Sequence, residues 1–284
     1  MPLFKRPDRA FLKTDRPLNI AHRGGRGLSP EHTIFTYKKA LQVGADVLEL
    51  DVHSTKDNEI VVIHDPTVDR TTDGKGLVNE LTLSEIKRLD AGYRFAIKRG
   101  DKEDYPFRGK GLAIPTLEEV FFEFPNQRIN IEIKQFEPQI EDTLIWIIKE
   151  KNMTDNVLVV SESHEAIKRF RKISKGAIAT GASVAEVRRF VIFTRLKIMP
   201  LYIPAADAFQ IPEYHGDYHL LTEKFIERAH KKNIKIHVWT INEKEDMERF
   251  IKLGVDGIIT DYPDLLNEVI NLLKSSLQEN IKNV

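Results

Sequence analysis

Short apolar runs alternate with longer amphipathic stretches along the whole chain. The runs hold four to seven residues and are rich in valine and isoleucine, whereas apolar positions in the longer stretches recur every three or four residues. The runs predict strands and the stretches predict helices, an alternation typical of a parallel sheet. Nine strands are expected, at residues 18–22, 47–53, 60–64, 128–134, 157–161, 177–181, 208–212, 236–241 and 257–260.

Helices are expected between most of these strands. The number and spacing of the strand–helix units fit a (β/α)8 barrel, or TIM barrel, which takes about 250 residues. The last helix is amphipathic from Leu265 onward, and we expect it to close the barrel wall. Residues 1–284 are therefore predicted to form a single α/β domain. The expected helices are 33–43, 138–151, 164–173, 184–193, 222–232, 243–253 and 263–281.

Two segments depart from this pattern. Only six residues, 54–59, join the second and third strands, and a parallel crossover needs about a dozen. These two strands are therefore predicted to be antiparallel, with one of them outside the barrel. Residues 66–115 form a polar, glycine-containing stretch with one expected helix at 84–89, and an insertion of this length is usually functional or mobile. We interpret it as an addition to the barrel and not as a second domain.

Composition excludes several classes of protein. Lysine plus arginine and aspartate plus glutamate number 43 each, so no overall positive field attracts nucleic acid. Cysteine is absent, so any metal must bind oxygen or nitrogen ligands. No apolar stretch approaches the roughly 20 residues that cross a bilayer, and residues 1–16 lack the apolar run of a secretory signal. We therefore expect no transmembrane segment and a cytoplasmic protein, unless a leader was removed.

Carboxylates follow the polar faces of two predicted strands. Because side chains alternate along a strand, Glu49, Asp51 and His53 share one face of strand 47–53. Glu132 lies on the corresponding face of strand 128–134, together with Asn130 and Lys134. Three carboxylates in one pocket repel one another unless a cation neutralises them, and oxygen ligands favour Mg²⁺ or Ca²⁺. The alternative is that these residues are ordinary solvated strand ends.

Two histidines end other predicted strands. His22 is followed by Arg23 and two glycines, and His64 is followed by Asp65. Imidazole titrates near neutral pH, so a pair of histidines can act as general base and general acid. Arg23 offers a planar donor suited to phosphate. Either histidine alone would more often be structural, and the argument for catalysis depends on their occurrence beside the carboxylates.

In order and spacing, these and further motifs resemble the glycerophosphodiester phosphodiesterases, over residues 20–263. The resemblance implies a TIM barrel that hydrolyses glycerophosphodiesters to glycerol 3-phosphate and an alcohol with a divalent metal. It also implies that the insertion lies over the barrel mouth. The motifs are His22-Arg23-Gly24, Pro30-Glu31-His32-Thr33, Glu49-Leu50-Asp51-Val52, Val62-Ile63-His64-Asp65, Ile131-Glu132-Ile133-Lys134, Val238-Trp239-Thr240-Ile241-Asn242 and Gly257-Ile258-Ile259-Thr260-Asp261-Tyr262-Pro263.

The resemblance also implies roles for individual residues. Glu49, Asp51 and Glu132 match metal ligands, and His22 and His64 match the catalytic acid–base pair. The positions that match phosphate- or substrate-binding residues are Arg23, Lys134 and Trp239, although Trp239 could equally be a core aromatic. His32 stands where the family more often has asparagine, and His53 is expected to support the site or lie at the surface. The implied route is attack by the neighbouring 2-hydroxyl of glycerol, followed by hydrolysis of the cyclic phosphate.

The sequence leaves the substrate open between glycerophosphodiesters and lysophospholipids, which would be cleaved to lysophosphatidic acid. Residues 184–202 form a basic amphipathic stretch that could contact an anionic membrane, although an ordinary barrel helix has the same pattern. Two further classes are a binding barrel without activity and a barrel phospholipase D of the sphingomyelin-cleaving type. The retained histidines and carboxylates argue against the first, and the lack of cysteine together with the polar insertion argues against the second.

Overall fold

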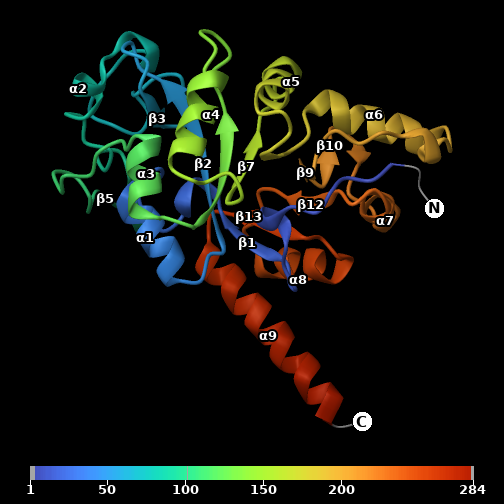
Figure 1. The fold of residues 1–284 in the computed structure, drawn as a ribbon. Coiled ribbons are helices and arrows are strands. Elements are labelled where there is room, and N and C mark those ends of the chain that lie inside the picture. Colours follow the sequence, from blue (N-terminus) through green and yellow to red (C-terminus); the bar gives the residue numbers. More distant parts are fainter. Residues whose placement is uncertain (1–3, 101, 283–284) are drawn as a thin grey trace.

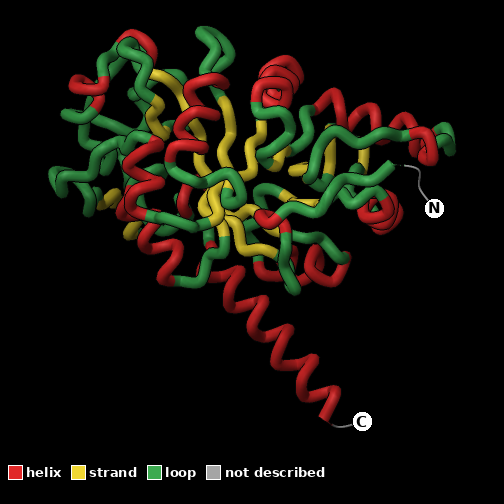
Figure 2. Tube along the Cα trace, viewed as in Figure 1, coloured by secondary structure: helices red, strands yellow, loops and turns green. Residues whose placement is uncertain are grey.

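Eight parallel strands form a nearly closed barrel in the computed structural model, which describes residues 4–100 and 102–282 (Figures 1 and 2). Their order around the barrel is β8, β7, β6, β2, β1, β13, β12 and β9. A parallel bridge between Gly181 and Ala208 brings the two ends of this order together. The predicted TIM barrel is confirmed. In chain order the strands are β1 (Leu18–Ala21), β2 (Val47–Ser54), β6 (Arg128–Ile133), β7 (Val157–Val160), β8 (Ala179–Thr180), β9 (Ala208–Ile211), β12 (Lys235–Val238) and β13 (Gly257–Thr260).

Helices surround the strands, and several begin at a hydroxyl side chain that accepts a hydrogen bond from the first turn. Thr33, Ser163, Ser183 and Thr222 cap their helices in this way. Helix α3 is absent from the predicted set because its seven residues make only about two turns of pattern. The helices are α1 (Ile34–Gln42), α3 (Leu117–Glu123), α4 (Glu141–Glu150), α5 (His164–Ile173), α6 (Val184–Arg195), α7 (Glu223–Lys231), α8 (Lys244–Leu253) and α9 (Pro263–Lys282).

The alternation along β2 and β6 separates an apolar outer face from a polar inner face. Leu48 and Leu50 on β2, and Ile131 on β6, are fully buried among the side chains of the surrounding helices. A smaller apolar cluster includes Ile20, Val47 and Leu158 from the strands, and Phe11 and Leu12 from the short helix η1 (Ala10–Leu12) join it. The polar residues of β2 and β6 therefore point into the barrel. They lie toward the carboxyl ends of the strands, away from the cluster that contains η1.

Strand β3 (Ile60–Val62) pairs antiparallel with β2, with Val62 opposite Val52, as the short connection predicts. The insertion that follows is more ordered than its polar composition indicates. Its apolar side chains, including Val68, Val78 and Ile86, form a small cluster with β3. Only one helical turn, α2 (Leu83–Ile86), stands where a helix at 84–89 is expected. The other elements are η3 (Val78–Glu80) and the hairpin of β4 (Ile97–Arg99) and β5 (Lys102–Asp104).

Helix α9 closes the wall over its first turns only. Leu266, Val269 and Ile270 are buried, and this part of the helix contacts α8 and β1. Leu272 is 59% exposed, and the helix continues away from the barrel at the bottom of Figure 1. The sequence prediction for this helix is thus right for the packed half, because an apolar stripe shows amphipathicity without showing how far a partner extends.

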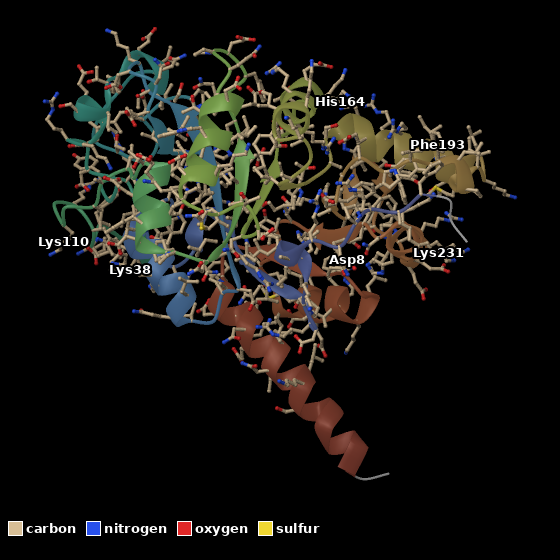
Figure 3. The ribbon with its side chains drawn as sticks, in the orientation of Figure 1. Asp8, Lys38, Lys110, His164, Phe193 and Lys231 are labelled. Carbon is tan, nitrogen blue, oxygen red and sulfur yellow. The ribbon has the colours of Figure 1, made fainter. Side chains whose placement is uncertain are left out.

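Two further short elements follow β8 and β9. The turn η4 (Met199–Leu201) comes after α6, and the hairpin of β10 (Tyr214–His215) and β11 (Tyr218–His219) comes after β9. In Figure 1 the insertion and α6 lie on opposite sides of the view, and Figure 3 marks these sides with Lys110 and Phe193. Across residues 4–100 and 102–282, no helix is long and apolar enough to span a bilayer. The cytoplasmic location stays a prediction.

Candidate active site

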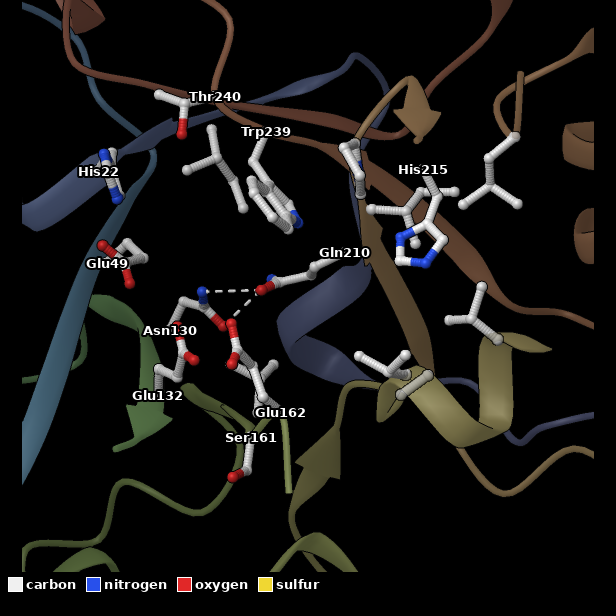
Figure 4. A pocket seen from close by; sticks show the side chains of 18 of the residues that line it. His22, Glu49, Asn130, Glu132, Ser161, Glu162, Gln210, His215, Trp239 and Thr240 are labelled. Carbon is white, nitrogen blue, oxygen red and sulfur yellow. Dashed lines mark hydrogen bonds between the residues drawn. The ribbon is translucent and has the colours of Figure 1, made fainter. Parts of the chain in front are cut away.

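A pocket of about 800 Å³ opens at the carboxyl ends of the strands. This end of a parallel barrel is where loops and strand ends can bring side chains from many elements together. Its lining changes character from one end to the other (Figure 4): polar side chains such as His22, Glu49 and Glu132 lie at one end, and apolar side chains lie toward His215. No described residue of the insertion is in this lining, although Arg70 of the insertion pairs with Asp65 and Glu31 beside it. The placement of the insertion over the barrel mouth stays a prediction.

Glu49, Asp51 and Glu132 come together at the polar end. In the parallel pairing of β2 with β6, Asp51 lies opposite Glu132. One oxygen of each carboxylate lies within 4.8 Å of the other two, and Glu49 and Asp51 are buried. Burial, reinforced by the charge of Asp51, raises the pKa of Glu49 well above its usual range and that of Glu132 to about 7. This cluster holds more negative charge than its environment readily solvates.

The donors of this cluster fit a hard divalent cation. All three are carboxylate oxygens, the ligands that Mg²⁺ and Ca²⁺ prefer. A bound cation would also offset the repulsion that raises the pKa values of Glu49 and Glu132. The sequence prediction that these three residues are neighbours is therefore confirmed, and they are the residues that could hold a metal.

His32 supports Asp51 from behind. Its Nε2 lies 2.9 Å from Oδ2 of Asp51, and its Nδ1 lies 2.9 Å from the hydroxyl of Tyr37 on α1. Burial raises the pKa of Asp51, but the hydrogen bond and the charge of His32 outweigh this and hold the pKa below its usual range. His32 thus fixes a carboxylate of the cluster, which explains how a histidine serves at this position.

Arg23 and Lys134 also lie in the pocket lining, as the sequence predicts. The backbone N–H of Arg23 donates to Oε2 of Glu49 at 2.7 Å, and its Nη1 donates to Glu31 at 3.1 Å. Lys134 Nζ lies 2.9 Å from Glu132 and 3.5 Å from Asp51. Both cations are therefore close to the acidic cluster, where they can meet an anion bound beside it.

The chain is folded tightly around Arg23. Arg23 has a φ of 50° and Gly24 a φ of 79°, both in the left-handed region. A Cβ atom on Gly24 would lie 2.7 Å from the ring of Tyr37. Glycine is therefore required here, because it lets β1 turn directly into η2 (His22–Gly24) and present the Arg23 amide to Glu49.

His22 is oriented by a carboxylate from the far end of the chain. Its Nδ1 lies 2.6 Å from Oδ1 of Asp261, just after β13. Arg26 donates to the same oxygen at 2.9 Å, and the Asn242 amide donates to the other at 3.0 Å. Burial lowers the pKa of His22, although the hydrogen bond to Asp261 acts in the opposite direction. With Nδ1 bound, Nε2 is the nitrogen available to the pocket.

His64 has a similar partner. Its Nδ1 lies 2.6 Å from Oδ1 of Asp65, and Arg70 of the insertion pairs with Asp65 and with Glu31. Burial lowers the pKa of His64, again against the hydrogen bond to Asp65. His53 is buried with Nε2 3.1 Å from the backbone oxygen of His64, so it supports the site, and the surface role considered from the sequence is wrong.

A polar layer crosses the barrel below the cluster. The side-chain amides of Asn130 and Gln210 exchange two hydrogen bonds of 3.2 Å, drawn in Figure 4, and Gln210 also lies 3.2 Å from Nδ1 of His237. His237 is fully buried, and burial lowers its pKa to about 4. This layer links β6, β9 and β12 and separates the polar end of the pocket from the apolar interior.

Helix α6 forms the apolar end of the pocket. Val184, Val187, Val191 and Ile192 line it, together with Arg188 from the same face of the helix. A barrel helix ordinarily has one apolar face toward the strands, and Val187 and Val191 also pack against the core cluster that contains the buried Phe190. Trp239 also lines the pocket and is 42% exposed, so it is not the core aromatic that the sequence allows as an alternative.

Barrel and pocket together define a TIM-barrel protein whose acidic and histidine side chains meet at the carboxyl end. The model of the glycerophosphoryl diester phosphodiesterase family matches residues 22–265. A glycerophosphodiester phosphodiesterase of Caldanaerobacter subterraneus subsp. tengcongensis is 41% identical over 271 residues, which cover 91% of this chain and 98% of that protein. The chain therefore belongs to this family of phosphoric diester hydrolases, and the resemblance seen in the sequence is confirmed.

Two further relatives widen the comparison. The crystal structure of glycerophosphodiester phosphodiesterase from Agrobacterium tumefaciens superposes with a TM-score of 0.72 at 25% identity, covering 89% of this chain and 99% of that one. The human lysophospholipase D GDPD1 is 26% identical over 294 residues, which cover 95% of this chain and 90% of that protein. The similarity thus extends over almost the full chain in each case.

Sequence reasoning missed the partners of the predicted residues. Asp261 lies in a motif that carries the resemblance, and Asp65 directly follows His64, yet neither was assigned a role. The adjacency of Asp65 to His64 was a usable signal. Arg26 and Arg70 gave none, because their contacts depend on how distant segments meet around the barrel mouth.

Proposed function

We propose that the protein hydrolyses glycerophosphodiesters to glycerol 3-phosphate and an alcohol, with His22 and His64 as the acid–base pair and a divalent metal ion as cofactor. The observation that carries the proposal is that both histidines line one pocket with Glu49 and Glu132, and each has a carboxylate 2.6 Å from its Nδ1. Paired in this way, each imidazole keeps one tautomer and presents Nε2 to the substrate.

Binding of the phosphodiester depends on positive charge at the polar end. Arg23 and Lys134 lie beside the acidic cluster and would face two phosphoryl oxygens. A divalent ion, Mg²⁺ or Ca²⁺, held by Glu49, Asp51 and Glu132 would supply further positive charge to the phosphoryl group. The three carboxylates would hold that ion, and His32 keeps Asp51 in position.

The two histidines then move protons in turn. One takes the proton of the glycerol 2-hydroxyl, whose oxygen attacks phosphorus, and the other gives a proton to the departing alkoxide. This step yields a five-membered cyclic phosphate and the free alcohol. In the second step the histidine that lost its proton takes one from water, the water oxygen attacks phosphorus, and the other histidine returns a proton to the 2-oxygen.

Single His22→Ala and His64→Ala proteins test the proposal. We expect each to lose turnover of glycerophosphocholine by about 100-fold or more, in assays with Mg²⁺ or Ca²⁺ and with EDTA as the metal-free reference. His230→Ala is a matched control, because His230 also pairs with an aspartate, Asp256, but outside the pocket. A folded His22 or His64 variant with the activity of the control would remove that histidine from the mechanism.

A second candidate substrate is a lysophospholipid, which would be cleaved to lysophosphatidic acid. The apolar wall of α6 favours it, because Val184, Val187, Val191 and Ile192 offer contacts that a water-soluble headgroup does not need. The similarity to a human lysophospholipase D agrees with this candidate. Incubation with glycerophosphocholine and lysophosphatidylcholine in parallel, followed by product identification, distinguishes the two substrates.

We also propose that the outer side of this wall touches a membrane surface. Leu196 and Leu201 are 62% and 65% exposed beyond the pocket. Residues 187–206 contain four basic residues and no acidic residue. Apolar side chains among basic ones are the combination that binds the interface of an anionic bilayer. The contact would be peripheral.

A further inference from the structure

One pocket carboxylate stands outside the arrangement described so far. Glu162 lies two residues after the end of β7, and its side chain is exposed within the pocket lining. Of the three carboxylates in that lining, Glu49 and Glu132 belong to the acidic cluster, whereas Glu162 does not. Figure 4 shows its carboxylate directed toward the space beside Asn130 and Gln210.

No residue in the described part of the chain donates a hydrogen bond to Glu162 or forms an ion pair with it. The nearby cations are committed elsewhere: Lys134 pairs with Glu132 and Asp51, and Arg23 pairs with Glu31. Arg26 pairs with Asp261. A free carboxylate next to three others adds to their repulsion, so its charge favours a positively charged group on whatever fills the pocket.

An aromatic surface borders the same pocket as this carboxylate. Trp239 lines the same pocket and is 42% exposed, and Figure 4 draws Gln210 between Trp239 and Glu162. The face of an indole attracts a cation within about 6 Å of the ring, most strongly when the cation carries little water. A carboxylate and an indole that border the same space can therefore bind an ammonium group from two sides.

We propose that Glu162, together with Trp239, selects phosphodiesters whose alcohol carries an ammonium group, as ethanolamine and choline do. The inference rests on the proposed function and adds a specificity-determining residue to it. The phosphate is held at the polar end, and the ammonium of the leaving alcohol lies between the carboxylate and the indole. A neutral alcohol such as glycerol gains nothing from either group.

Arginines at the other end of the pocket sharpen this assignment. Arg188 and Arg195 line the wall formed by α6, and Arg195 lies over the ring of Tyr218, 4.7 Å from its centre. An ammonium placed there would be repelled. The pocket thus has a positive side at α6 and a negative side at Glu162, so a cationic headgroup has a defined place.

The test compares substrates that differ only in the alcohol. For wild type and Glu162→Gln, kcat/KM is measured with glycerophosphocholine, glycerophosphoethanolamine and glycerophosphoglycerol. We expect the ratio of kcat/KM for the two cationic substrates to that for glycerophosphoglycerol to fall about tenfold in Glu162→Gln. Glu162→Lys should lower the ratio further. The matched control is Glu165→Gln, which makes the same change of charge on an exposed residue of α5 outside the pocket.

Binding provides a readout that does not depend on turnover. In the His22→Ala protein with Mg²⁺, calorimetry gives Kd for glycerophosphocholine and glycerophosphoglycerol, with and without Glu162→Gln. We expect only glycerophosphocholine to bind more weakly after the substitution. If wild type hydrolyses no diester, the proposed function fails while this measurement still decides the role of Glu162.

Two results would overturn the inference. One is an unchanged ratio in both the kinetic and the binding measurement. The other is an equal loss for cationic and neutral substrates together with weaker Mg²⁺ binding in Glu162→Gln, which would make Glu162 part of the metal site. Circular dichroism and thermal unfolding check that each variant is folded.

Discussion

Nδ1 of His22 lies 2.6 Å from Oδ1 of Asp261, although 239 positions separate the two residues in the chain. β1 and β13 are neighbours in the barrel, with Ala21 opposite Thr260, so the residues that follow each strand meet at the mouth. Because the Asp261 carboxylate accepts a hydrogen bond from Nδ1, a neutral His22 carries its proton on Nδ1. Nε2 is then left to face the pocket. In the proposed mechanism, Asp261 would therefore be a positioning residue that acts on the substrate through His22.

Replacing Asp261 by asparagine should lower kcat by about 100-fold, because the amide no longer stabilises the charged imidazole or fixes its tautomer. The interaction with Asp261 raises the pKa of His22, so its removal should also move the limb of the pH–rate profile that reports His22 to lower pH. Steady-state kinetics across pH measures both effects. An unchanged limb at reduced kcat would indicate a purely structural role.

Replacing Glu49 by glutamine should weaken binding of Mg²⁺ or Ca²⁺ by about 100-fold or more, since a charged ligand becomes a neutral one. The glutamine oxygen can still accept the hydrogen bond from the Arg23 amide, so we expect the fold to be kept. Isothermal calorimetry with each metal measures the change. Glu118→Gln, which removes a surface partner of Lys151, is the control, and equal affinities in the two variants would refute the assignment of Glu49.

The free energy of unfolding should decrease as pH is lowered, because His237 is buried. Burial lowers its pKa to about 4 in the folded protein, from an ordinary value of about 6.5. Between these values the unfolded chain binds a proton that the folded protein does not, so stability falls as pH falls. From pH 7 to pH 4 the loss from this residue is about 3 kcal/mol.

Urea unfolding at several pH values, for wild type and His237→Gln, isolates this contribution. Other groups also titrate in this range, but they are common to both proteins, so the difference in slope reports His237. The variant should show a shallower loss of stability toward pH 4. Parallel curves would mean that His237 is protonated in the folded protein without cost.

The surface beyond α6 should bind anionic vesicles at low salt. Replacing Leu196 and Leu201 by serine should reduce co-sedimentation with phosphatidylglycerol vesicles several-fold while hydrolysis of glycerophosphocholine continues. Phe122→Ser is the control, because Phe122 on α3 is even more exposed, at 82%, and belongs to a different side of the barrel. Vesicle binding that is absent in wild type, or lost equally in the control, would rule out this surface.

Much of the fold follows from local pattern. The strands around Glu49 and Glu132 could be located because their outward residues, such as Leu50 and Ile131, form an unbroken apolar alternation. The antiparallel β3 could be inferred from the length of one connection. The hairpin of β10 and β11 could not be inferred, because strands of two residues are too short to show an alternation of apolar and polar positions.

The candidate site divides in the same way. Asp51 and Glu132 can be matched from the sequence because the polar faces of their strands predict a shared pocket. The partner of Asp51 could not be identified from the sequence. His32 reaches Asp51 only because the chain turns through a left-handed residue and because Tyr37 holds the other ring nitrogen of His32. Glu162 gave only a weak signal, because its place after the predicted strand 157–161 does not by itself distinguish a pocket carboxylate from a solvated one.

By itself the sequence determined the barrel, the polar faces of its strands and the identity of the acidic and histidine residues, since each depends on periodicity or on the chemistry of single residues. Only the tertiary structure decided which carboxylate orients which histidine, that apolar side chains of α6 line the pocket, and that Glu162 has no hydrogen-bond or ion-pair partner among the described residues. The physical reason is that hydrogen bonds and burial depend on distances between segments far apart in the chain, and these distances exist only once the barrel closes.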